Sequence, residues 1–512
     1  MQNPSPDKPT SDPLDRGDRS DRNTASAPSR TAGWFRRWSL GVYVLIVIAL
    51  SLMAFRVNAP DMPGGGRYAG IAGTDGQAYY AFVRSLIIDG DLDFQNEFYE
   101  FNFNKHGFQT PDFLPRSPLT GRIFNRFPIG FSVFHLPFFL LAHLLTLLGN
   151  AAGLCRLEPN GYSALYQLAA PLSTIFYGAL AYWTTQKVLR RFVSEGAAAV
   201  ATFVLFLSYQ GVFNVIWFWC NPHLHSCLVF NCMLLLAFRV EDRRDVPRTW
   251  AGLGALTGAA GLLRTECLAL AFLPLLLFCW RLRGVPGDAA AQWRRLSSLR
   301  FCRRLRGVPS GATVPEGERW RAVSRAAAAL AAFSLVFFPQ ILVWRLMWGE
   351  WFTLPMNSPS EGFSWAHPAL WQVLVSTRHG LFYWSPVLLI GLAGLVWLLC
   401  VRRAGIAVWL SLVPALVLYY IYASWRIWWM GYSFGARQFV VLTVLFGIGL
   451  AYGMEKAGRR YRWIVGAGAL CLIAWNMAML WMFLNGHIPR SEGFPFWLPF
   501  RKLLELALRI IS

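Results

Sequence analysis

The chain has 512 residues, of which 55% are hydrophobic and only 15% charged. Soluble globular domains carry about 25% charged residues, so this composition excludes an ordinary soluble protein and predicts one that crosses a membrane many times. The net charge of +21 does not indicate a nucleic-acid partner, because the arginines stand in short clusters beside apolar runs, as topology signals do.

The first elements are a polar tail and a single apolar run. Residues 1–33 are rich in proline, serine, aspartate and arginine, which predicts a disordered tail, placed in the cytoplasm by the topology below. The run 38–56 is too long for an ordinary signal peptide and has no clear small-residue cleavage site. We therefore expect a retained first membrane span and a cytoplasmic N-terminus.

Further apolar runs recur along residues 34–484, the expected transmembrane domain. Only helices satisfy their own backbone in lipid, so the fold class predicted is all-α, a polytopic bundle of about 11–13 spans. After the first, the candidate spans are 127–149, 163–187, 196–218, 224–239, 250–263, 266–281, 326–347, 381–400, 405–424, 437–453 and 462–484.

Loop charge sets the expected orientation. The insert 282–325 is strongly basic, which places it in the cytoplasm. The long loop 57–126 then faces the other side, with the shorter loops 219–223, 264–265, 348–380, 425–436 and 485–500. Only an odd number of crossings fits between the exported loop 57–126 and the basic pair at 190–191, yet two apolar runs lie there. Either one run is re-entrant or interfacial, or one arginine pair violates the rule.

The two non-cytoplasmic segments of greatest interest are the first loop and the C-terminus. In the loop, Asp75 precedes apolar residues at three- and four-residue steps, which predicts a short interfacial helix that Asp75 caps or adjoins. Residues 485–512 combine an exported loop with a leucine-rich segment interrupted by charges. This pattern predicts an interfacial C-terminal helix rather than a further span.

The first loop resembles that of the GT-C membrane glycosyltransferases, which include the aminoarabinose transferase of lipid A and the protein O-mannosyltransferases of glycosyltransferase family 39. The matching residues are Asp75 with Tyr79, Gly90-Asp91-Leu92, and Arg126-Phe127-Pro128-Ile129. The departures are Gly76 where a second acid is common, Leu92 for tryptophan and Arg126 for lysine.

The resemblance implies an inverting transferase that moves a sugar from a polyprenyl-phosphate donor on the non-cytoplasmic face. Asp75 would take the proton of the acceptor hydroxyl, with Tyr79 in support. The missing second acid puts a two-carboxylate or metal-holding site in doubt, so a divalent metal stays open but is not required by the sequence. The partners implied are the lipid-linked donor, a lipid, glycan or protein acceptor, and the membrane.

Arginine suits the donor phosphate because its planar fork binds two oxygens at once. The candidates are Arg126, Arg264, Arg378 and Arg437. Arg264 lies at membrane depth, where the simplest alternatives are pairing with Glu266 or reaching toward headgroups. Arg437 ends a segment that looks like the Gly-x-x-Phe-Gly-x-Arg stretch of the same group of enzymes.

Two histidines, His223 and His225, lie where the loop 219–223 meets the run 224–239, and they favour a supporting polar role over a metal site. Two other functions stay open: a transporter or flippase of a lipid-linked sugar, and a polymerase or ligase of surface polysaccharide. No internal repeat supports a transporter. The excess of arginine over lysine favours a bacterial inner membrane.

Overall fold

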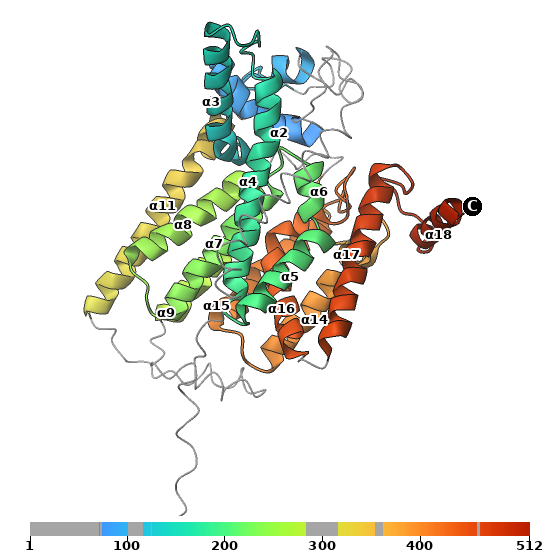
Figure 1. Ribbon diagram of the computed structural model, residues 1–512. Coiled ribbons are helices and arrows are strands. Elements are labelled where there is room, and N and C mark those ends of the chain that lie inside the picture. The colour runs from blue at the N-terminus through green and yellow to red at the C-terminus, as the bar shows by residue number, and fades with distance from the viewer. Residues whose placement is uncertain are drawn as a thin grey trace, which may run out of the picture.

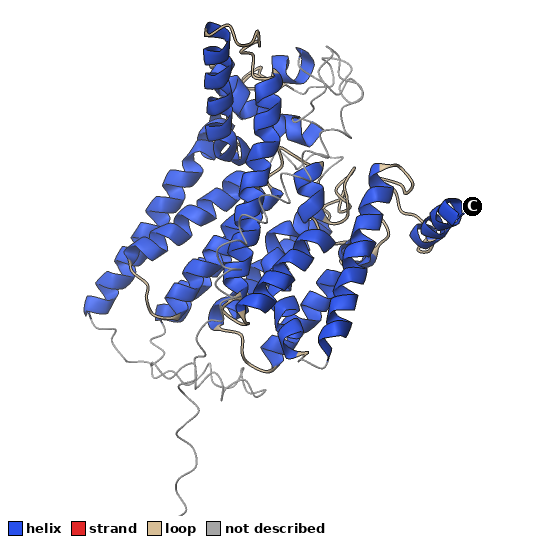
Figure 2. Ribbon diagram, in the orientation of Figure 1, coloured by secondary structure: helices blue, strands red, loops and turns tan. Residues whose placement is uncertain are grey.

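The computed structural model describes residues 71, 74–100, 116–123, 125–282, 316–353, 362–457 and 461–511. The predicted tail 1–33, the predicted first span 38–56 and most of the basic insert 282–325 therefore lie outside the described residues. The described residues form helices joined by loops, with two isolated bridges and no strand (Figure 2). The all-α prediction is confirmed for this part of the chain.

The described helices that precede the insert are α2 (Thr74–Arg84), α3 (Gly130–Ala151), α4 (Ala164–Leu189), α5 (Glu195–Ser208), α6 (Gly211–Ile216), α7 (His223–Glu241), α8 (Pro247–Leu263) and α9 (Phe272–Leu282). Those that follow it are α11 (Glu316–Trp348), α12 (Gln372–Val375), α13 (Leu381–Trp384), α14 (Val387–Cys400), α15 (Ile406–Ser424), α16 (Thr443–Lys456), α17 (Arg462–Leu484) and α18 (Leu498–Ile511). Short irregular turns of helix are η1 (Ser85–Asp89), η2 (Asn96–Glu100), η4 (Thr265–Ala271) and η5 (Arg437–Leu442).

The helices run alternately between two ends of the bundle (Figure 1). We call the end where α7 begins and α8 ends the site face, and the end where α9 ends and α11 begins the insert face. Among the described residues, eight helices are long and apolar enough to cross a membrane, and α5 and α14 are shorter apolar helices. The chain is thus a multi-pass membrane protein.

The apolar run predicted at 127–149 is α3, and it lies on the site face. Gly130, its first residue, packs against the backbone of Leu262 at the end of α8. At the other end, the loop from α3 to α4 meets α2, because the Tyr80 hydroxyl donates to the carbonyl of Gly161. Figure 1 shows α3 at the top of the view, beside the upper part of α4. Both ends of α3 lie on the side of α2, so only α4 runs from there to the insert face, which fits the odd number of crossings that the loop charges require.

Two predicted spans are interrupted. The run 196–218 breaks after Ser208, where Tyr209 and Gln210 leave the helix and donate to the carbonyls of Ala436 and Phe434. The residues at the break therefore anchor the end of the loop 425–436, which lies on the site face, to the interior of the bundle. The run 381–400 breaks at Ser385, just before Pro386, because proline cannot continue the hydrogen-bond ladder.

Helices α14 and α16 pack unusually closely through glycine. A Cβ on Gly449 would overlap the carbonyl oxygen of Gly391, and one on Gly394 would overlap that of Gly449. Small residues allow such contact between backbones in membrane helices, where no hydrophobic effect drives association.

Replacing Gly449 by alanine should therefore separate α14 from α16 and cost about 1–3 kcal/mol of stability, as overpacking typically does. The measurement is the melting temperature of the purified protein in detergent. Gly466→Ala is the control, because it lies on α17, outside the contact between α14 and α16, with no atom within 4 Å of its added Cβ. Equal melting temperatures for the two variants would contradict the close contact.

Candidate functional site

Helix α2 carries Asp75 in its first turn, where the partial positive charge of a helix N-terminus favours an anion. The predicted interfacial helix is thus present, although it packs against other helices and its central residues Tyr80 and Phe82 are fully buried. At Gly76, a Cβ would lie 3.2 Å from the carbonyl oxygen of Trp219. The tight approach of α2 to the loop 219–222 leaves little room for a second acid at this position.

Asp75 forms an ion pair with Arg437, which follows it by 362 residues in sequence. Nη2 of Arg437 donates to Oδ2 of Asp75 at 2.7 Å. The side chain of Arg437 is 10% exposed and that of Asp75 is 23% exposed, so the arginine stands behind and the carboxylate faces the open side. The Nε of Arg437 is buried and has no hydrogen-bond partner within the described residues.

A second ion pair lies beside the first. Arg264, at the turn between α8 and η4, donates through Nη2 to Oε1 of Glu266 at 2.6 Å. Its Nη1 contacts Nδ1 of His223 at 3.2 Å and the carbonyl oxygen of Gln438 at 3.3 Å. As in the first pair, the arginine is more buried than the acid: the side chain of Arg264 is 6% exposed and that of Glu266 is 27% exposed. Both arginines are therefore held rigidly, with an acid on the outer side of each.

Aromatic rings connect the two pairs. The guanidinium of Arg437 lies 4.4 Å from the ring centroid of Phe218, and that ring stacks on His223 at 5.9 Å. The guanidinium of Arg264 lies 5.5 Å from the ring centroid of Tyr422. Such rings exclude water and attract cations, so they fix the arginines where electrostatic interactions are strong.

Tyr79 lies one turn after Asp75 and is 7% exposed. Its ring contacts that of Phe127 at 4.6 Å between centroids, and burial raises the pKa of its hydroxyl above the ordinary value of 10. The charges that act on the hydroxyl are those of the two ion pairs, Arg264 with Glu266 and Asp75 with Arg437. Tyr79 thus stays a proton donor beside both pairs.

The other predicted site residues lie farther out or face elsewhere. Arg126 is exposed, with its guanidinium 5.2 Å from the ring centroid of Phe127, the ring that also contacts Tyr79. Arg378 lies over the ring of Trp429 at 3.4 Å and donates to the carbonyl of Ser491 at 2.8 Å, so it joins two loops of the site face.

His225 faces away from the ion pairs. Its ring packs against Phe131, Phe134 and Tyr177 of α3 and α4, at 4.7 to 5.6 Å between centroids. Two residues along a helix turn the side chain by about 200° (from 3.6 residues per turn), so His223 and His225 could not both reach the site. The structure brings only His223 to Arg264.

Four residues of the site were not predicted: Phe218, Tyr422, Gln438 and His379. His379 adopts a positive φ of 62° and its Nδ1 contacts the carbonyl oxygen of Trp429 at 2.6 Å. Burial lowers the pKa of His379 to about 4, so the ring is neutral and Nδ1 donates. The only feature of the sequence that pointed to His379 was its position next to Arg378. Phe218, Tyr422 and Gln438 lie in ordinary apolar or polar runs, which gave no sign of a role in the site.

Among the described residues, no group of three or more histidine, cysteine, aspartate or glutamate side chains stands close enough to hold a metal ion. The two acids of the site each face an arginine instead.

A separate buried cluster stiffens the loop after α2. Arg84 contacts both Asp89 and Glu97, the latter at 2.9 Å. Glu97 is fully buried, and burial raises its pKa to about 8, although Arg84 acts in the opposite direction. The folded protein therefore holds a proton on Glu97 at neutral pH.

This shift predicts a pH dependence of stability. Between the ordinary pKa of 4.5 and about 8, the folded state keeps a proton that the unfolded state loses. Stability from this group is thus largest below pH 4.5 and falls as pH rises to 8, by on the order of a few kcal/mol. The melting temperature of the wild type minus that of Glu97→Gln should fall from pH 5 to 8 and then level off. A constant difference would contradict the raised pKa.

Comparisons with known proteins give structural neighbours only. No family model and no curated protein matches this chain. Among solved structures, the chain is similar to ArnT from Cupriavidus metallidurans bound to undecaprenyl phosphate, with 14% identity over 86% of this chain and 70% of that one and a TM-score of 0.45. It is also similar to the archaeal oligosaccharyltransferase AglB from Archaeoglobus fulgidus in complex with an inhibitory peptide and a dolichol-phosphate. There the identity is 12% over 90% of this chain, which spans 57% of the archaeal chain, and the TM-score is 0.45.

Proposed function

We propose that this protein is a GT-C type glycosyltransferase that moves a sugar from a polyprenyl-phosphate donor to an acceptor hydroxyl on the non-cytoplasmic face of a membrane. The observation that carries the proposal is the ion pair of Asp75 with Arg437. It lies beside the ion pair of Arg264 with Glu266, where the loops of the site face meet. One carboxylate and two rigid guanidinium groups are the side chains that this transfer needs.

Asp75 would act as the general base. The acceptor oxygen attacks the anomeric carbon of the sugar while its proton passes to the carboxylate of Asp75, and the bond from that carbon to the phosphate oxygen breaks. The attack and the departure occur on opposite faces of the sugar, so the configuration inverts. Arg437 orients the carboxylate through the 2.7 Å hydrogen bond.

The arginines would serve the leaving group. Polyprenyl phosphate departs with added negative charge on its oxygens, and fixed guanidinium groups stabilise that charge without having to reorganise. Arg264 and Arg437 are buried and held from behind, which supports this role. Arg126 and Arg378, at the edges of the site, would attract the headgroup as it enters, and Tyr79 would donate a hydrogen bond.

The same proposal sets the orientation. The site face is non-cytoplasmic, the insert face is cytoplasmic, and the N-terminus is cytoplasmic, in a bacterial inner membrane. The amphipathic α18 stands off the bundle at the site face and would lie in the membrane interface (Figure 1). A donor with a lipid tail reaches such a site from the bilayer while its acceptor comes from the aqueous side.

The deciding experiment incubates the purified protein, in liposomes, with polyprenyl-phosphate sugars labelled on the sugar. A transferase releases free polyprenyl phosphate and labels an acceptor. A flippase moves the donor between leaflets and leaves it intact. Movement of intact donor, with no free polyprenyl phosphate for any acceptor class tried, would overturn the proposal.

A further inference from the structure

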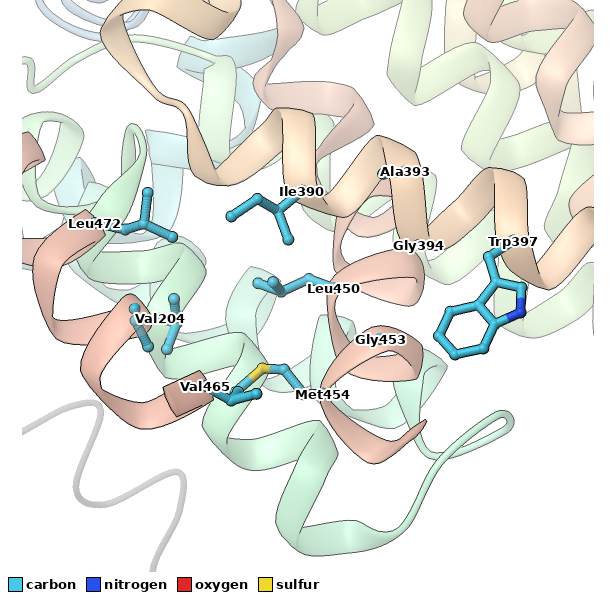
Figure 3. A pocket seen from close by; sticks show the side chains of 12 residues that line it. Val204, Ile390, Ala393, Gly394, Trp397, Leu450, Gly453, Met454, Val465 and Leu472 are labelled. Carbon is cyan, nitrogen blue, oxygen red and sulfur yellow. The ribbon is translucent and has the colours of Figure 1, made fainter. Parts of the chain in front are cut away.

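An apolar groove lies between α14, α16 and α17, with α5 at its back (Figure 3). Its volume is about 380 Å³, within the usual range of about 300–1,000 Å³ for pockets that bind small molecules. The side chains of Ile390, Trp397, Leu450, Met454 and Val465 line it, and the remaining lining residues are also apolar or glycine.

The groove lies toward the insert face, at the opposite end of the bundle from Asp75. Trp397 is in the last turn of α14, which ends at Cys400, and Met454 is in the last turn of α16. Val465 is in the first turn of α17, which begins at Arg462. The groove therefore opens at the depth of the leaflet on that side.

Glycines keep this groove open. A Cβ on Gly453 or Gly468 would have no atom within 4 Å, although both residues line the groove. In membrane helices, small residues usually stand where backbones touch, as Gly391 and Gly449 do on the neighbouring interface. At 453 and 468 the missing side chains instead leave space between helices. Unfilled apolar space forfeits packing energy, which a hydrocarbon chain would restore.

Positive charge borders the same end of the groove. The ammonium of Lys456 lies 5.8 Å from the ring centroid of Tyr452, and that ring contacts the Trp397 indole at 5.4 Å. Arg402 and Arg403 follow α14 after Val401. Clusters of basic residues at a membrane surface attract anionic headgroups.

We propose that the groove binds one acyl chain of an anionic phospholipid from the leaflet at the insert face, with its headgroup beside Lys456. The glycines make room for the chain, and the basic residues select the headgroup. The lipid would link α17 to α14 and α16. This site does not depend on the proposed transfer reaction.

The test fills the groove with a side chain. Protein purified in mild detergent containing phosphatidylglycerol and phosphatidylethanolamine is analysed by native mass spectrometry. The wild type should retain one phosphatidylglycerol that Gly468→Leu lacks. The matched control is Gly466→Leu on the same helix, which also has open space but does not line the groove, and it should retain the lipid. Lys456→Gln should lower the preference for phosphatidylglycerol at least threefold.

A second measurement does not require the filled variant to fold. Phosphatidylglycerol with brominated acyl chains should quench the fluorescence of the wild type more than that of Trp397→Phe, and brominated phosphatidylcholine should give a smaller difference. The proposal is overturned if folded Gly468→Leu retains the lipid. It is also overturned if the difference in quenching is absent, or if the retained molecule is a polyprenyl lipid.

Discussion

Replacing Asp75 by asparagine should lower the turnover of sugar transfer by about 10²–10⁴-fold, the usual contribution of a general base. The amide still accepts the hydrogen bond from Arg437, so the buried arginine keeps a partner and the fold is retained. The measurement is the initial rate of polyprenyl phosphate release at saturating donor, with the melting temperature measured alongside.

The control for Asp75 is Asp93→Asn. Asp93 belongs to the same loop, and its carboxylate accepts the backbone N–H of Ile123 at 3.3 Å, away from the ion pairs. It should keep the wild-type rate. The Asp75→Asn protein should still bind polyprenyl phosphate, because in the proposed mechanism the arginines, and not Asp75, hold the leaving group. A fully folded Asp75→Asn protein with wild-type turnover would exclude Asp75 as the base.

Replacing Arg264 by lysine should raise the KM for the donor by about 10–100-fold, because an ammonium cannot reproduce the two parallel hydrogen bonds of a guanidinium to phosphate. Lysine also cannot contact Glu266, His223 and the carbonyl of Gln438 together, as Arg264 does. The positive charge remains beside Glu266, and the melting temperature is measured alongside to separate lost donor binding from lost stability. Steady-state kinetics at varied donor concentration give the value.

The control for Arg264 is Arg345→Lys. Arg345 also lies at the site face, but it is exposed and its guanidinium lies over Trp351. This variant should keep the wild-type KM. If Arg264→Lys binds the donor as tightly as the wild type, the phosphate is held by other groups, and Arg437 becomes the main candidate.

Local patterns in the sequence were sufficient to locate the helices. The apolar runs predicted as spans match helices in the described residues, since burial in lipid demands long apolar helices whatever their neighbours. The helix after Asp75 was also visible, because three- and four-residue steps show directly in the chain. Runs interrupted at Ser208 and Ser385 were not recognised as broken, because hydropathy averages over the break.

The sequence by itself thus determined a helical membrane protein, the position of Asp75 at a helix start, and the arginines worth considering. Only the tertiary structure decided that Arg437 pairs with Asp75 across 362 residues, that α3 stays on the site face, and that His223 rather than His225 reaches Arg264. The reason is physical: periodicity and hydropathy report what surrounds one helix, whereas an ion pair depends on how two distant helices are placed against each other.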